Sequence, residues 1–366
     1  MKKIKCLLIT VMAMVAAGSL TACSSDDDNN SSSNVDRYQE AVNAAVKSTR
    51  SASGNTKAIL LVAFGSTWQQ AYDAFDKTAS DYKTQFPGYD VYLSFSSAIC
   101  INRSAAGEHV ASRNFYAPSY WLAAFAQPGV QYSTIVVQSM QVIPGEEYTR
   151  VINYIKDFAN NSTGDLDDSY LSKVKLYLGT PLMADSTTDV QNLANVLNTD
   201  FSSYAQKGVV AFMGHGNPDT YDTYKANVRY TQLEKALQKL NKNYYVGTVD
   251  MRNNYKTFVE TRMKANGITS GTVYCHPLMT IAGDHAHNDM AGNDCAATPF
   301  TANDEGEVEN TSWKMYFGKT GYTCDDKTQL VKGLLEYDNV RALWINHTKV
   351  AIAGEALDYY HSKNPD

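Results

Sequence analysis

Short apolar runs alternate with helical patterns along most of the chain. Residues 57–64 form a continuous apolar run, as in a strand buried on both faces of a sheet. The next segment spaces Tyr72, Phe75 and Tyr82 along one helical face. This alternation is typical of parallel sheets with helices on both faces, so an α/β fold is predicted. Further strands are predicted at 90–95, 132–138, 173–178, 208–213, 244–249, 271–276 and 339–346, with a last helix near 349–360.

The strand-helix alternation starts over after a polar break at residues 160–168. Two doubly wound parallel-sheet lobes flanking a central cleft are therefore predicted, over 57–170 and 171–366. The C-terminal lobe would carry the metal site described below. The polar segment 293–310 lacks apolar periodicity and is expected to be an inserted loop.

The beginning of the chain has the pattern of a targeting segment. A basic start and an apolar stretch lead to Leu20-Thr21-Ala22-Cys23, which matches a lipobox. A signal peptide over 1–22 and a lipidated Cys23 are predicted; the alternative is an ordinary secretory cleavage site. Residues 23–56 would be an acidic and polar tether, whose helical pattern at 36–50 docks on the body or remains a stalk. These features predict an extracytoplasmic lipoprotein, at the periplasmic face or the outer-membrane surface.

Charge and cysteine content narrow the partners. The net charge is -6 and no basic stripe occurs, which argues against nucleic acid. Membrane contact is expected only through the lipid at Cys23, and a homo-oligomer is compatible with the sequence. Cys295 and Cys324 lie in polar stretches and could form a disulfide, whereas Cys100 and Cys275 lie in apolar runs and are expected to be buried thiols.

Three polar residues follow predicted strands of the second lobe. His215, Asp250 and His285 would meet at the carboxyl edge of one parallel sheet. Two imidazoles and a carboxylate suit a divalent ion such as Co²⁺, Fe²⁺, Ni²⁺ or Zn²⁺. The alternatives are a turn histidine at 215, a helix-capping carboxylate at 250, and a polar loop capped by Asp284 or Asn288.

Two other chemistries find little support in the sequence. The turn at residues 65–67 lacks the further glycines and the lysine of a phosphate-binding loop. The chain also has no G-x-S-x-G elbow, which argues against an α/β-hydrolase.

Several motifs together resemble a known family, the anaerobic sirohydrochlorin cobaltochelatases of cobalamin synthesis. These are class II chelatases with a ferrochelatase-like fold, two α/β lobes around a tetrapyrrole cleft. The resemblance spans about residues 57–355. It rests on VAFGSTW (62–68), SFSSAI (94–99), VVQSMQVIPGEEY (136–148), VVAFMGHG (209–216), VGTVD (246–250) and HPLMTIAGDHAHNDMAG (276–292).

The resemblance assigns His215, Asp250 and His285 as metal ligands, and the two histidines also as catalytic residues. Asp250 replaces the usual Glu and is one methylene shorter, while Gln141 stands where the family typically has a His. Within the matching motifs, the residues expected to bind the tetrapyrrole are Gly65, Ser66, Ser96, Gln141 and Glu146.

The expected activity is insertion of Co²⁺, or another divalent metal, into a tetrapyrrole in anaerobic cobalamin biosynthesis. The exported location and the two departures are the support for an alternative, a non-catalytic surface lipoprotein that binds haem, another tetrapyrrole or metal for scavenging. Removal of metal from an imported tetrapyrrole would use the same residues.

Overall fold

The computed structural model of the chain describes residues 31–295 and 311–359. The predicted signal peptide, Cys23 and most of the expected 293–310 loop lie outside these ranges. Among the helices of the described ranges, none is both long and apolar enough to span a bilayer.

The first sheet is parallel and has the order β2-β1-β3-β4. Its strands are β1 (Lys57–Ala63), β2 (Tyr89–Phe95), β3 (Thr134–Ser139) and β4 (Lys175–Gly179). The lobe boundary predicted at residue 170 is therefore wrong, because β4 belongs to this sheet. The polar break before β4 is an ordinary connection between a helix and the next parallel strand.

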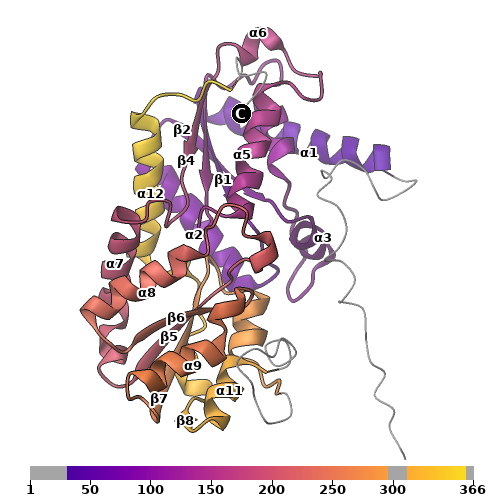
Figure 1. Ribbon diagram of the computed structural model, residues 1–366. Helices are drawn as coiled ribbons and strands as arrows, with labels where there is room; N and C mark the ends of the chain where they lie inside the picture. Colours follow the sequence, from indigo (N-terminus) through magenta and orange to yellow (C-terminus); the bar gives the residue numbers. More distant parts are fainter. Residues whose placement is uncertain (1–30, 296–310, 360–366) are drawn as a thin grey trace, which may run out of the picture.

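The second sheet repeats this arrangement, with the order β6-β5-β7-β8 and parallel pairing throughout. Its strands are β5 (Val209–Gly214), β6 (Tyr244–Thr248), β7 (Gly271–Leu278) and β8 (Tyr322–Thr323). The predicted α/β architecture of two parallel-sheet lobes is confirmed (Figure 1).

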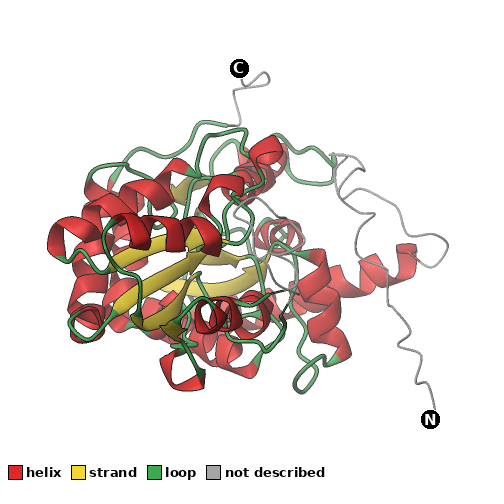
Figure 2. Cartoon of the chain, turned by 60° about the horizontal axis from the view of Figure 1, so that its bottom comes forward, coloured by secondary structure: helices red, strands yellow, loops and turns green. Residues whose placement is uncertain are grey.

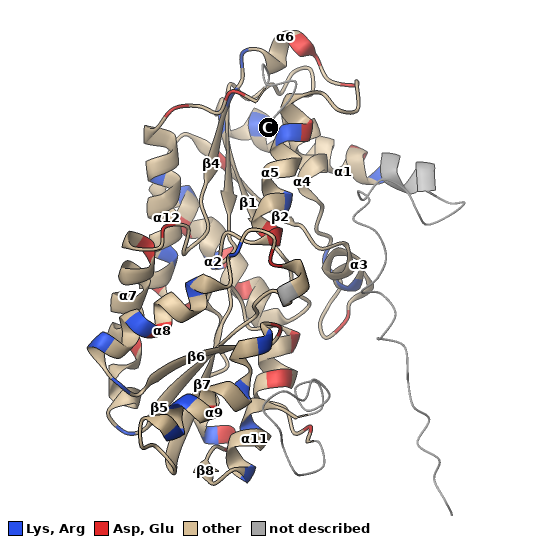
Figure 3. Cartoon of the chain, in the orientation of Figure 1, with Lys and Arg blue, Asp and Glu red and all other residues tan. Residues whose placement is uncertain are grey.

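Helices cover both faces of each sheet, as the continuous apolar strands require (Figure 2). Acidic and basic residues are interspersed on these helices in the view of Figure 3. The longer helices are α2 (Gln69–Gln85), α3 (Ala98–Ala106), α4 (Pro118–Phe125), α5 (Glu146–Ala159), α7 (Thr188–Ala205), α8 (Val228–Leu240), α9 (Lys256–Ala265), α11 (Trp313–Lys319) and α12 (Asp338–Ala353), with a short α6 (Asp168–Leu171).

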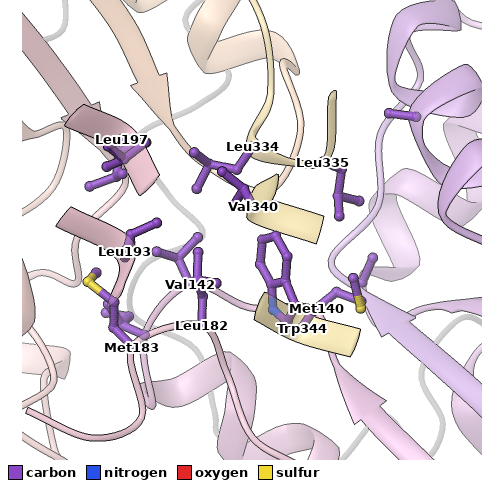
Figure 4. Packing of buried hydrophobic residues seen from close by; sticks show 14 of the residues in the cluster. Met140, Val142, Leu182, Met183, Leu193, Leu197, Leu334, Leu335, Val340 and Trp344 are labelled. Carbon is purple, nitrogen blue, oxygen red and sulfur yellow. The ribbon is translucent and has the colours of Figure 1, made fainter. Parts of the chain in front are cut away.

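One hydrophobic cluster runs through both lobes. It joins Ile59 and Leu61 of the first sheet to Val210 and Phe212 of the second, while the opposite faces of the two sheets belong to separate clusters. Figure 4 shows part of it, where Trp344 packs beside chain segments from both halves of the sequence. The two lobes therefore share a core on one side of the molecule.

The C-terminal part of the chain is helical where a strand was expected at 339–346. In α12, Val340, Trp344 and Thr348 are fully buried and lie four residues apart, so they share one helical face. The apolar run is too short to distinguish a buried strand from a helix by periodicity. Since α12 packs on β3 and β4, the end of the chain completes the first lobe.

The segment before β1 also differs from the predicted tether. Residues Ser31–Ser53 form helix α1, which packs against α4. Val42 and Val46 are fully buried there, and the Gln39 side chain donates a hydrogen bond to the Tyr120 carbonyl at 3.0 Å. Of the two alternatives for this helix, docking on the body is confirmed.

Candidate functional site

The loops after the strands of one sheet meet those of the other. The Thr280 hydroxyl, beyond β7, donates to the Met140 carbonyl, beyond β3, at 2.6 Å. The Thr223 amide, in the loop after β5, donates to Glu146 Oε1 at the start of α5, at 3.1 Å. The carboxyl edges of the two sheets therefore face each other. A separate cavity of about 380 Å³ lies between α2 and α12, where Lys77, Asp338 and Lys349 line it.

The predicted residues follow the strands at which each sheet reverses its strand order. In the first sheet, the chain leaves β1 for β2 on one side, and β3 lies on the other; Gly65 and Ser66 follow β1, and Gln141 follows β3. In the second sheet, β5 and β7 hold the same places, and they lead to His215 and His285. Ligand sites of open α/β sheets form at such points.

His215, Asp250 and His285 come together at the edge of the second sheet. The rings of His215 and His285 are edge to face, with centroids 4.8 Å apart. His215 Nδ1 lies 3.4 Å from Asp250 Oδ2, and the Asp250 amide donates to the His215 carbonyl at 2.9 Å. Gly216 allows this approach: its φ is +80°, and an added Cβ would lie 3.0 Å from the Met251 nitrogen.

The orientation of both imidazoles is fixed through Nδ1. His215 Nδ1 donates to the Gly216 carbonyl at 2.7 Å, and His285 Nδ1 donates to Asp289 Oδ2 at 2.5 Å. Because carbonyl and carboxylate oxygens only accept, each Nδ1 carries a hydrogen, and each neutral ring keeps its lone pair at Nε2. Both rings are therefore in the tautomer that binds metal through Nε2.

His285 begins a π-helical turn that covers His285–Met290. Such turns are rare and frequently occur at functional sites. Burial lowers the affinity of His285 for a proton, but the hydrogen bond and charge of Asp289, with the charges of Asp250 and Asp284, outweigh it and raise the pKa. About two fifths of the His285 side chain is exposed, so a ligand can reach it.

In the described ranges, no three or more His, Cys, Asp or Glu side chains form a group with the geometry of a metal site. The three predicted ligands lie close together without being assembled around one point. A metal ion at this place would be bound by the Nε2 atoms of His215 and His285 and by the Asp250 carboxylate. All three side chains are partly exposed to solvent.

The predicted first-lobe residues shape the facing edge. Gly65 has a φ of +123°, and an added Cβ would lie 2.6 Å from Cys100 Cβ, so only glycine fits. Ser66 and Ser96 are buried; the Ser66 hydroxyl accepts the Trp68 amide hydrogen at 3.2 Å. Gln141 is buried as well. Its side-chain oxygen accepts a hydrogen bond from the Ser139 hydroxyl, and its Nε2 is unpartnered.

Comparison with known proteins identifies the family. Residues 57–353 match the family model of the cobalt chelatase CbiK. The chain belongs to this cobalt chelatase family. The match covers both lobes, α12 included, and begins at β1.

Two curated relatives align over nearly their whole length. The sirohydrochlorin cobaltochelatase of Salmonella typhimurium is 27% identical over 300 residues, which is 81% of this chain and 96% of the relative. The sirohydrochlorin cobaltochelatase CbiKC of Nitratidesulfovibrio vulgaris is 25% identical over 303 residues, 82% of this chain and 92% of the relative. Among solved structures, SirB from Bacillus subtilis with Fe³⁺ has a TM-score of 0.46 at 13% identity, covering 82% of this chain and 99% of that one.

The chelatase carries further polar and apolar groups at this place, of which Glu147, a secondary candidate from the sequence, is one. Glu147 receives a hydrogen bond from the Ser96 hydroxyl at 3.4 Å, and burial raises its pKa against the opposing charges of Arg150 and His215. Phe64 and Ile99, at the carboxyl edge of the first sheet, are 48% and 64% exposed. Phe64 and Ile99 lie inside the matching motifs, and this was a usable signal. Their exposure, however, cannot be read from the sequence.

Trp68 of the chelatase connects the lobes beside the predicted metal ligands. Its indole lies between the rings of His109 and His287, with centroid distances of 4.4 and 3.7 Å. Its Nε1 donates to Asp284 Oδ1 at 2.7 Å, and Asp284 also lies 3.7 Å from Arg103. The cap expected from Asp284 is absent, because its carboxylate accepts the indole hydrogen instead.

Proposed function

We propose that the protein is a metal chelatase that inserts Co²⁺ into sirohydrochlorin. The observation that carries the proposal is the pair of imidazoles, His215 and His285, each with Nδ1–H bonded to a fixed acceptor and Nε2 left for an ion. Family membership and the names of both curated relatives support the reaction.

Metal insertion requires an ion stripped of water, a bent ring and the removal of two pyrrole protons. His215 and His285 would hold the ion through Nε2 and then accept the protons as the metal passes to the ring, both of which need neutral imidazole. Asp250, 3.4 Å from His215, would offset the positive charge of the ion. Holding metal and ring in a near-attack geometry supplies the remaining rate enhancement.

The first lobe would hold the ring. A flat, largely apolar macrocycle needs exposed apolar contact and a few polar groups around its rim. Phe64 and Ile99 offer that contact across from the histidines, and Ser96 and Glu147 offer polar groups. The buried Ser66 and Gln141 would support this wall from behind.

The test is absorbance-monitored insertion of Co²⁺ into sirohydrochlorin by wild type, His215→Ala and Asp250→Asn. Asp165→Asn, the same change at an exposed carboxylate in the loop after α5, is the matched control. We expect turnover by wild type and the control, and a loss of about 100-fold or more in the two site variants. Tight ring binding by wild type without accelerated insertion would support the non-catalytic scavenging lipoprotein and overturn the chelatase.

We further propose that the chelatase is exported and anchored through lipid on Cys23, as the lipobox predicts. Metabolic labelling with an alkyne-bearing fatty acid should mark the wild type and leave Cys23→Ser unmarked. Label retained by Cys23→Ser would contradict the anchor, and this result would leave the insertion assay unaffected.

A further inference from the structure

Two cysteines meet in the second lobe, and they are not the pair expected from the sequence. Cys324 Sγ lies 3.8 Å from Cys275 Sγ, and the Cys295–Cys324 disulfide that the sequence allowed is not formed in the structure. Cys275 is fully buried within β7, and Cys324, directly after β8, is 9% exposed. The sequence could not show this, because the contact depends on the pairing of β8 with β7.

The backbone around both cysteines is held by strand pairing. Thr272 pairs with Thr323, and Cys275 pairs with Gln329, so the chain leaves β7 at Cys324 and returns five residues later. Cys324 follows Thr323, the register partner of Thr272, so Cys324 and Cys275 are not opposite each other in the ladder, and their side chains reach toward each other to bring the sulfur atoms to 3.8 Å. Formation of a disulfide of about 2.0 Å requires the two sulfur atoms to approach each other by a further ~1.8 Å.

The surroundings shift the pKa values of the two thiols in opposite directions. The Cys324 sulfur accepts hydrogen bonds from Gln329 Nε2 at 3.3 Å and from the Thr328 hydroxyl at 3.7 Å, and it shares a hydrogen bond with the Cys275 thiol in which either sulfur can be the donor. The hydrogen bond between the two thiols, with smaller contributions from Thr328 and Gln329, lowers the pKa of Cys324 against burial. That same bond, together with burial, raises the pKa of Cys275. Cys324 is thus the partner that ionises more readily, and it is also the more accessible of the two.

We propose that Cys275 and Cys324 form a redox site that a disulfide-bearing oxidant converts into a disulfide. The Cys324 thiolate attacks the oxidant, forms a mixed disulfide and releases one thiolate of the oxidant. Cys275 then gives up its proton, and its sulfur attacks Cys324 Sγ and displaces the second thiolate. Two protein thiols are oxidised and one external disulfide is reduced to two thiols.

A disulfide between Cys275 and Cys324 would tie the segment after Cys324 to β7, and this segment lies against the chain that leads to the turn with His285. Beyond Cys324, the amide of Leu330 donates to the Cys275 carbonyl at 2.8 Å, and the amide of Leu334 donates to the Met279 carbonyl at 2.9 Å. This segment follows the chain from β7 toward the turn that carries His285. Because a disulfide acts mainly by restricting the unfolded chain, its effect is expected on stability rather than on the chemical step.

The test is refolding of the full chain in oxidised dithiothreitol, followed by alkylation, digestion and mass spectrometry. We expect a linked peptide pair containing Cys275 and Cys324 in wild type and in Cys295→Ala. The double variant Cys275→Ala/Cys324→Ala should lack it. Refolding exposes both thiols to the oxidant, so burial cannot prevent the reaction. Alkylation of both cysteines after refolding, or a Cys295–Cys324 peptide, would overturn the proposal.

A second measurement tests whether this disulfide ties the segment in place. Reduction should lower the thermal midpoint by about 5 °C in wild type and Cys295→Ala, and leave the double variant unchanged. A linked peptide with the same midpoint before and after reduction would retain the redox site but remove its structural role.

Discussion

The two lobes share one strand order but differ in what stands at their carboxyl edges. The first edge holds a glycine with a positive φ, buried hydroxyls and exposed apolar side chains, among them Gly65 and Phe64. The second holds His215, Asp250 and His285, with both imidazoles oriented through Nδ1. The same topology thus offers exposed apolar side chains on one side and the proposed metal ligands on the other. A reaction that joins a flat ring to an ion needs both.

Substitutions that alter one sheet edge at a time give the strongest test of these separate roles. His285→Ala should lower turnover about 1000-fold and weaken Co²⁺ binding, because it removes a ligand and a proton acceptor, with sirohydrochlorin affinity almost unchanged. Phe64→Ala should weaken sirohydrochlorin binding about tenfold and leave Co²⁺ affinity unchanged, because it removes apolar contact alone. Separate titrations with ring and metal measure both. Equal losses of both affinities in either variant would contradict these separate roles.

The length of the acidic side chain is a second point of comparison. Asp250→Asn removes the charge that offsets the ion, and turnover should fall about 100-fold. Asp250→Glu keeps the charge and restores the side chain typical of the family, so its activity should stay within about threefold of wild type. Steady-state kinetics over a range of Co²⁺ concentrations measure both changes. Inactivity of the Glu variant would show that the shorter side chain is required here.

The bond between the lobes at Trp68 can be cut without removing the ring stack. Trp68→Phe loses the hydrogen bond to Asp284 but keeps an aromatic ring between His109 and His287. We expect kcat to fall about tenfold with little change in KM for Co²⁺, because the turn that carries His285 is held less firmly. Trp121→Phe is the matched control, since the Trp121 Nε1 is buried without a partner. Equal kcat in the two variants would remove the positioning role.

The smallest expected effect concerns an ion pair on the side of the molecule where the two lobes share a hydrophobic core. His347 of α12 lies 3.3 Å from Asp189 of α7, and both are largely buried. Burial opposes protonation of His347, but the hydrogen bond and charge of Asp189 outweigh it and raise the pKa. The ion pair therefore stabilises the fold fully below about pH 6.5, the ordinary value for His, and its contribution disappears as the pH rises through the raised pKa.

His347→Gln should accordingly cost about 1 to 2 kcal/mol of unfolding free energy near pH 5.5 and much less near pH 8.5. Urea denaturation at both pH values measures the difference between wild type and variant. A cost that is the same at both pH values would show that the ion pair does not contribute.

Much of the fold, and the clustering of three polar residues at one sheet edge, could be predicted from the sequence. Continuous apolar strands require helices on both faces, and polar residues that follow parallel strands gather at one edge, which placed His215, Asp250 and His285 correctly near one another. Their metal-binding role stays a prediction. The boundary between the lobes could not be found, because the strand order decides to which sheet β4 belongs.

Features that depend on long-range packing were missed for the same reason. The run at 339–346 carries no signal that distinguishes a buried strand from a helix, and only its position beside β3 and β4 explains α12. The indole of Trp68 and the carboxylate of Asp284 are 216 residues apart in sequence. The contact between Cys275 and Cys324 depends on a two-residue strand, which is too short to predict.

The most direct test of the central claim is an anomalous difference map at the cobalt absorption edge from crystals grown with Co²⁺. The account predicts a peak between His215 Nε2, His285 Nε2 and the Asp250 carboxylate, with ligand distances of about 2.0–2.2 Å. A well-occupied cobalt peak elsewhere in the molecule, with these three side chains unchanged, would contradict it.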